Sequence, residues 1–240
     1  MILDERTRDA LVAETRFRDV RFMESTGSTN ALVAQMAAQG APEGLVIATD
    51  FQTAGRGRLD RSWEARPGDG LLVSVLLRPA DLPADRWHLV TAAVALAAQA
   101  ACREVAGIEP AIKWPNDLLV GGRKLAGILA EANGGAVTVG MGLNVHGGPP
   151  GAAVLDEEVG RRVAREDLLV AWLRRLDSRA GDWAAVSEDY RRRCDTLGRT
   201  VSVELTGGER LEGWAEGVDD TGRLIVAGRP VSVGDVTHLR

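Results

Sequence analysis

The segment FQTAGRGRLDRSW, residues 51–63, combines positive charge with backbone freedom and organises the interpretation of the whole chain. It carries three arginines, two glycines and a tryptophan, at Arg56, Arg58, Arg61, Gly55, Gly57 and Trp63. Guanidinium groups bind phosphate and carboxylate oxygens, often through two parallel hydrogen bonds, and glycine lets a backbone approach a ligand closely. We interpret the segment as an anion-binding loop; a solvated basic loop is the alternative.

Apolar runs on both sides place this loop between two strands. LVIAT at 45–49 and LLVSVLL at 71–77 are typical of buried strands, which leaves a connection of roughly 20 residues. Connections of this length are uncommon in compact domains unless they are functional or disordered. The loop therefore remains the first candidate for a ligand site.

The composition limits the classes of protein that fit. The chain has 240 residues, 45% of them hydrophobic, and a formal net charge of -5, so a general nucleic-acid surface is not expected. We expect neither a signal segment nor a membrane span, and the cytoplasm is the expected location. Cys102 and Cys194 have no disulfide or zinc spacing, and we expect both to be buried.

The segment AIKWPNDLLV, residues 111–120, predicts a strand interrupted at a Pro-Asn-Asp bend and then resumed. Gly-Gly at 121–122 predicts a tight hairpin turn, and 123–131 the returning partner strand. The hairpin brings Lys124 back toward the bend. Asp117 could there bind a divalent cation or steer an amine, with Asn116 as an oxygen donor, or it could be a plain turn residue.

Small and polar residues mark further candidate positions. Ser28, Thr29 and Asn30 precede a helix predicted at 31–39, where they could cap the helix, bind a polar ligand group, or do both. Gly127 in the middle of a strand suggests close approach of a ligand. Residues 136–145 predict the last strand of this sheet, where glycines at 140 and 142 leave room for a flat ligand and which Asn144 ends.

The remaining pattern predicts two domains. Residues 1–195 hold further helices at 5–18, 85–105, 165–181 and 183–197, a strand at 20–24 and a loop at 145–160. Trp172, Trp183 and Tyr190 are expected in the core. Residues 196–240 consist of short alternating segments separated by Gly and Asp turns, which is typical of a small β-barrel.

Five motifs, in this order and spacing, resemble those of biotin–protein ligases, in the class that lacks an N-terminal DNA-binding domain. They are Ser28-Thr29-Asn30, Gln52 with the arginine loop to Trp63, KWPNDL at 113–118, RKLAG at 123–127 and GMGLN at 140–144. The resemblance covers residues 20–240. It implies an α/β catalytic domain with a mixed sheet flanked by helices, followed by an SH3-like barrel. It also implies MgATP-dependent activation of biotin to biotinyl-5′-AMP and transfer to one lysine of a biotin carboxyl carrier domain, without binding to nucleic acid or membrane.

The same resemblance implies roles for individual residues. The catalytic candidates are Lys124, Arg58 and Asp117, and Asp117 is also the candidate Mg²⁺ ligand. The biotin-binding candidates are Ser28, Thr29, Asn30, Gln52, Gly55, Arg56, Gly57, Arg58, Lys124 and Gly127. The ATP-binding candidates are Arg58, Arg61, Trp63, Asn116 and Asn144. The arginine loop is expected to order over the ligand and exclude water.

Departures from the family pattern and rival interpretations remain. Thr53 and the pair Leu59-Asp60 differ from the residues common in the family, and Asp60 is expected to face solvent or pair with Arg61. A lipoate–protein ligase or octanoyltransferase of the same fold is the nearest alternative. A non-catalytic module that uses the arginine loop as a simple anion site is another, and a nucleic-acid binder is disfavoured by the negative net charge.

Overall fold

A seven-stranded sheet forms the centre of the first domain. The computed structural model describes residues 5–205, 208–232 and 234–239, so the ends of the two predicted domains, residues 1–4 and 240, lie outside the described part. The strands are β1 (Asp19–Thr26), β2 (Leu45–Gln52), β3 (Gly70–Leu77), β4 (Ala111–Lys113), β5 (Asp117–Val120), β6 (Arg123–Asn133) and β7 (Ala136–Asn144). Their order is β1-β2-β3-β7-β6-β5-β4. β1 and β2 pair in parallel and the other neighbours antiparallel, so the predicted mixed sheet is confirmed.

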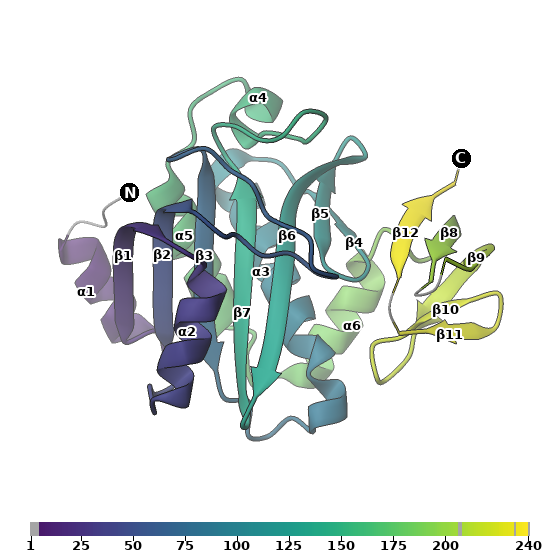
Figure 1. The fold of residues 1–240 in the computed structure, drawn as a ribbon, viewed down its shortest axis with the longest axis horizontal. Coiled ribbons are helices and arrows are strands. Elements are labelled where there is room, and N and C mark those ends of the chain that lie inside the picture. The colour runs from purple at the N-terminus through teal and green to yellow at the C-terminus, as the bar shows by residue number, and fades with distance from the viewer. Residues whose placement is uncertain (1–4, 206–207, 233, 240) are drawn as a thin grey trace.

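Helices cover the two faces of this sheet unequally (Figure 1). The short helix α2 (Thr29–Ala38) packs on one face, where Val33 joins residues of β2 and β3 in a small apolar cluster. On the other face lie α3 (His88–Ala106), α5 (Arg165–Asp177) and α6 (Trp183–Arg193). The connection at 53–69 crosses in front of β7 and β6 on the α2 side. The arginine loop therefore lies on the face of the sheet that α2 covers.

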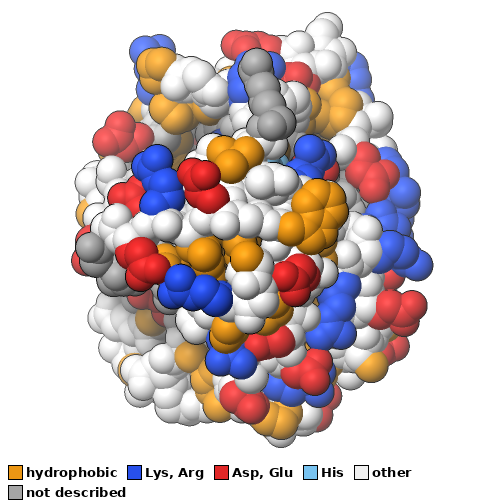
Figure 2. All heavy atoms as spheres, turned by 90° about the vertical axis from the view of Figure 1, so that its right-hand side faces the viewer, with side chains coloured by type: hydrophobic (Ala, Val, Ile, Leu, Met, Phe, Trp, Pro, Cys, Tyr) orange, Lys and Arg blue, Asp and Glu red, His pale blue; other side chains and the backbone are white. Residues whose placement is uncertain are grey.

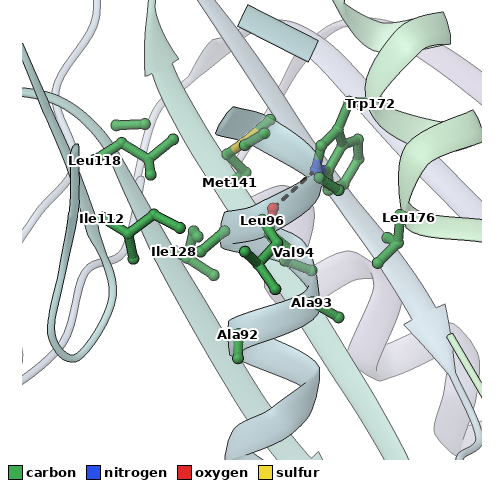
Figure 3. Packing of buried hydrophobic residues seen from close by; sticks show 14 of the residues in the cluster. Ala92, Ala93, Val94, Leu96, Ile112, Leu118, Ile128, Met141, Trp172 and Leu176 are labelled. Carbon is green, nitrogen blue, oxygen red and sulfur yellow. Dashed lines mark hydrogen bonds between the residues drawn. The ribbon is translucent and has the colours of Figure 1, made fainter. Parts of the chain in front are cut away.

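The main core forms between the sheet and α3. Ala92 and Ala93 of α3 let the sheet and α5 approach closely, and Trp172 of α5 donates from its indole nitrogen to the Val94 carbonyl oxygen at 3.4 Å (Figure 3). Trp172, Trp183 and Tyr190 are buried, as expected, and both cysteines are buried and free. The segment Ala84–Ala106 is long and apolar enough to cross a membrane, but it is mostly buried, as befits a core helix.

Several predicted boundaries are wrong by a few residues for local reasons. Helix α1 spans Glu5–Glu14 rather than 5–18, because the Thr15 hydroxyl bonds back to the Leu11 carbonyl and accepts from the Phe17 amide, which turns the chain out of the helix. The helix predicted at 85–105 is divided into a short 3₁₀ turn, Ala84–Arg86, and α3. The predicted helices at 165–181 and 183–197 end earlier, at Asp177 and Arg193. The predicted loop at 145–160 contains the short helix α4 (Leu155–Val159).

The Pro-Asn-Asp segment reverses the chain rather than bending one strand. β4 and β5 are antiparallel neighbours, with Lys113 opposite Asp117, and the Trp114–Pro115 peptide bond is cis. β6 returns after the predicted turn at Gly121 and Gly122, both of which have positive φ. Asn116 is the last residue of this turn, where its carbonyl oxygen accepts from the Ile128 amide of β6 at 2.9 Å and its Nδ2 donates to the Ile128 carbonyl at 2.7 Å.

The C-terminal part forms a separate five-stranded antiparallel sheet. Its strands are β8 (Thr200–Glu204), β9 (Arg210–Val218), β10 (Leu224–Val226), β11 (Arg229–Val231) and β12 (Asp235–His238). β9 is the longest of these strands and runs through Gly213 without a break. On the face that includes this sheet, acidic and basic side chains are interspersed (Figure 2), in keeping with ion pairs such as Arg191–Asp220 and Arg229–Glu209. The division of the chain at 195/196 remains a prediction.

Candidate active site

A cavity of about 120 Å³ lies between the arginine loop and the α2 face of the sheet. Most of the predicted site residues line it: Ser28, Thr29, Asn30, Gln52, Arg56, Gly57, Arg58, Arg61, Trp63, Asn116, Asp117, Lys124 and Gly127. Gly55 and Asn144 are not among the lining residues. Ligand pockets commonly measure about 300–1,000 Å³, so this cavity is small for a nucleotide-sized ligand.

The start of α2 presents a set of hydroxyl and amide groups. Ser28 is the N-cap residue, and its Oγ accepts from the Ala31 amide at 3.4 Å. The Thr29 amide and hydroxyl both donate to Gln52 Oε1, at 2.8 and 3.0 Å, and the Thr29 hydroxyl also lies 2.8 Å from Ser74 Oγ. Because Gln52 Oε1 is engaged in this way, the Gln52 Nε2 group is the donor left for the cavity.

Asn30 supplies the complementary acceptor. Its Nδ2 donates to Glu131 Oε2 at 2.7 Å, whereas its Oδ1 is buried and has no hydrogen-bond partner among the described residues. A Cβ at Gly140 would lie 2.7 Å from this oxygen, so glycine is needed there for the amide to fit. A buried acceptor without a hydrogen bond destabilises the folded protein unless a ligand donates to it. Asn30 lines the cavity, so a ligand bound there could supply the donor.

The arginine loop is a tight hairpin over the cavity. Gly57 donates from its amide to the Arg61 carbonyl at 2.7 Å, and Trp63 to the Gly55 carbonyl at 3.0 Å. Leu59 and Asp60 at the tip have positive φ, 54° and 58°; aspartate adopts this conformation more readily than leucine. Asp60 is exposed, as expected, and Arg61 forms its ion pair with Asp235 of β12.

Cationic groups surround one carboxylate at the other end of the cavity. Lys124 Nζ lies 2.7 Å from Asp117 Oδ1, which confirms that the hairpin brings the two residues together, and Arg58 donates to Asn116 Oδ1 at 3.1 Å. Burial lowers the pKa of Arg58, and burial also lowers the pKa of Lys113, which sits opposite Asp117. The excess of positive charge makes this end suitable for carboxylate and phosphate groups.

Trp63 occupies the flat space that the glycines provide. A Cβ at Gly142 would lie 2.3 Å from Trp63 Cε2, and one at Gly127 would lie 3.0 Å from its Cζ3. The Lys124 ammonium stands 5.7 Å from the centroid of the indole, within cation–π range. The room expected for a flat ligand at Gly140 and Gly142 is thus filled by the protein's own Asn30 amide and Trp63 indole.

Asn144 lies behind the cavity rather than in its wall. It is buried, and its Nδ2 donates to the carbonyl oxygens of Lys124 and Ala153, at 3.3 and 3.2 Å. It therefore holds the backbone of Lys124 against the connection that follows β7. Its assignment to the ATP side stays a prediction.

The structure adds four residues that the sequence interpretation left without a role. Ser74, Glu131, Lys113 and Asp235 contact or border the candidate site residues. Ser74 had a visible signal, because it is a hydroxyl residue inside an otherwise apolar strand. Asp235 had none, because it comes from the C-terminal sheet. Among the residues described, no group of three or more His, Cys, Asp or Glu side chains forms a metal cluster.

Comparison with known proteins defines the class to which this fold and site belong. Residues 22–147 match the biotin/lipoate A/B protein ligase family, and residues 196–239 match the biotin protein ligase C-terminal domain. The chain therefore belongs to the biotin/lipoate A/B protein ligase family.

Within this family, the individual relatives are biotin ligases. The chain is 40% identical to the biotin–[acetyl-CoA-carboxylase] ligase of Mycobacterium tuberculosis, over 99% of this chain and 96% of the relative. It is 35% identical to the enzyme of that name from Paracoccus denitrificans, over 85% and 92% of the two chains. The biotin protein ligase of Aquifex aeolicus, solved with biotin and ATP, shares the fold with a TM-score of 0.79, 23% identity and coverage of 93% and 100%.

Proposed function

We propose that this protein is a biotin–protein ligase that activates biotin with MgATP and transfers the biotinyl group to a lysine of a carrier domain. The membership of the family and the identity with biotin–[acetyl-CoA-carboxylase] ligases over 99% and 85% of the chain support this activity. The carrier domain, the Mg²⁺ and the cytoplasmic location are parts of the proposal.

One observation carries the choice of substrate: the hydrogen-bonding polarity of the cavity beside Asn30. Gln52 Nε2 is an available donor and Asn30 Oδ1 an unpaired buried acceptor. A ureido ring offers a carbonyl acceptor and N–H donors, which complement these two groups. The acyl tail of lipoate or octanoate offers neither. The polar end of the cavity therefore favours biotin over the substrates of the rival ligases.

The cations at the other end suit the adenylation step. Joining a carboxylate to the α-phosphate of ATP brings two anions together and displaces pyrophosphate, which requires positive groups held in place. We assign Lys124 to the biotin carboxylate and the bridging phosphate, with Arg58 and Arg61 nearer the phosphates. Arg61 has to leave Asp235 to take this role.

Mg²⁺ fits the site as an ion carried by ATP. Asp117 and the Asn116 side-chain oxygen are suitable hard ligands, but Asp117 pairs with Lys124 and Asn116 accepts from Arg58. Mg²⁺ commonly uses one or two carboxylates together with substrate phosphates. We therefore expect Asp117 to supply a single protein ligand, and the ion to neutralise phosphate charge when ATP binds.

Pyrophosphate release tests this proposal directly. The protein is incubated with MgATP and biotin, lipoate or octanoate in separate reactions, with the Lys124→Ala variant in parallel. Release with biotin, lost in the variant, is the expected result. Release with lipoate or octanoate instead would indicate a ligase for that acid. No release with any of the three acids would favour a non-catalytic anion-binding module.

A further inference from the structure

Glu131, near the end of β6, connects three separate parts of the site. Its Oε2 accepts from Asn30 Nδ2 at 2.7 Å, and its Oε1 lies 2.8 Å from Arg56 Nη2. Arg56 Nη1 also reaches Oε2, at 3.3 Å, so guanidinium and carboxylate meet through both oxygens. The side chain is about one-third exposed, and one carboxylate therefore contacts the strand, the start of α2 and the arginine loop together.

This contact determines which way the Asn30 amide faces. A carboxylate paired with an arginine accepts hydrogen bonds and donates none, so Asn30 has to direct its Nδ2 group toward Glu131. The Leu129 carbonyl, 3.4 Å from Nδ2, is a second acceptor on the same side. Oδ1 is then left facing the opposite way, buried and unpartnered at the cavity wall.

We propose that Glu131 is a positioning residue that sets substrate specificity, because it fixes the Asn30 amide so that the cavity accepts an N–H group from the ligand. Glu131 acts through Asn30, and Arg56 keeps its carboxylate in place. The inference rests on the proposed function, since the ureido N–H of biotin is the donor that Asn30 Oδ1 would accept.

The test measures the preference for an N–H donor rather than affinity alone. The probes are biotin and its two cyclic carbamate analogues, in each of which one ureido N–H is replaced by a ring oxygen. Dissociation constants measured by calorimetry give the ratio of analogue to biotin. The analogue whose ring oxygen faces Asn30 Oδ1 cannot donate to it and should bind wild type about tenfold or more weakly than biotin.

Glu131→Gln should reduce this ratio about tenfold, because the new amide can donate to Asn30 and allow it to turn its Nδ2 toward the cavity. The double variant Glu131→Gln with Asn30→Asp should restore the ratio. In that variant the introduced glutamine amide donates to a side chain at position 30 that can only accept, so an acceptor faces the cavity again. Glu212→Gln, an exposed change on β9, is the matched control and should leave the ratio unchanged.

The outcomes separate this inference from the proposed function. A wild-type protein that activates biotin, with a ratio unaltered by Glu131→Gln, would overturn the role of Glu131 and leave the ligase activity intact. A fall in biotin affinity without a change in the ratio would also overturn the role of Glu131, because a general loss of structure weakens the binding of biotin and both analogues equally. If Glu131→Gln alone does not fold, the double variant decides, because its ratio has to equal that of wild type. A wild-type protein that neither binds nor activates biotin would overturn both proposals.

Discussion

Replacing Lys124 by alanine should remove most of the adenylation rate while leaving the fold almost unchanged. The Lys124 side chain is 43% exposed and its partner Asp117 18% exposed, at an N–O distance of 2.7 Å. Ion pairs with this much solvent access contribute about 0–1 kcal/mol to stability. Arg58 and Lys113 remain near Asp117 in the variant, so no isolated negative charge is created. For a domain of this size, the melting temperature should fall by about 2–4 °C or less.

The effect on chemistry should be much larger than the effect on stability. Losing one fixed donor to the charge that develops in a transition state costs about 2.7–4 kcal/mol, or roughly 10²–10³ in rate. Lys124→Arg keeps the charge, but its planar group is larger than the ammonium, which already lies 3.1 Å from the position of a Cβ on Gly127. We expect Lys124→Arg to retain part of the activity.

The assay is pyrophosphate release at saturating biotin and MgATP, with a thermal melt of each variant. Glu212→Gln serves as a charge-changing control on an exposed strand far along the chain. A Lys124→Ala rate within about threefold of wild type would refute the assignment, given the expected factor of 10²–10³. A melting temperature that falls in step with the rate would show that the loss comes from unfolding.

Three further outcomes follow from the same geometry. Biotin should slow amide exchange at residues 55–66, which close over the cavity; equal protection with and without biotin would contradict the closure. Gly142→Ala places a Cβ 2.3 Å from Trp63, so it should speed exchange in this loop, whereas Gly217→Ala, with no atom within 4 Å, should not. Burial lowers the pKa of His88, so below about pH 6.5 the unfolded chain binds more protons than the folded chain. The free energy of unfolding should therefore fall as the pH drops through this range. His88→Gln should make this fall shallower, as measured by urea titrations at pH 5 and 8.

Much of the fold follows from local patterns. The run LLVSVLL predicted β3, and the glycine pair at 121–122 predicted the hairpin that opposes β5 to β6. The errors arise where side chains compete with the backbone, as when Thr15 ends α1 early. Another error lies at Pro115, where a single bent strand was predicted and the chain instead reverses into an antiparallel partner. Sequence periodicity indicates that both segments are strands but not their relative direction.

The candidate site divides in the same way. The charges of the arginine loop, the capping residues of α2 and the approach of Lys124 to Asp117 follow from chain connectivity, because these residues lie in one loop, one helix start or one hairpin. The filling of the glycine-lined space by Trp63 could not be predicted, because the same glycines would serve a ligand or an indole equally well.

The sequence by itself determined the kinds of chemical group available: arginines on a long loop, hydroxyl and amide groups at a helix start, and a lysine and an aspartate on one hairpin. The tertiary structure alone decided how these groups face one another. Glu131 meets Asn30 across 101 positions of sequence, and Asp235 meets Arg61 across 174. Contacts at such separations depend on how the sheet, α2 and the C-terminal strands pack, and packing depends on the shapes of many side chains together, which a local pattern does not encode.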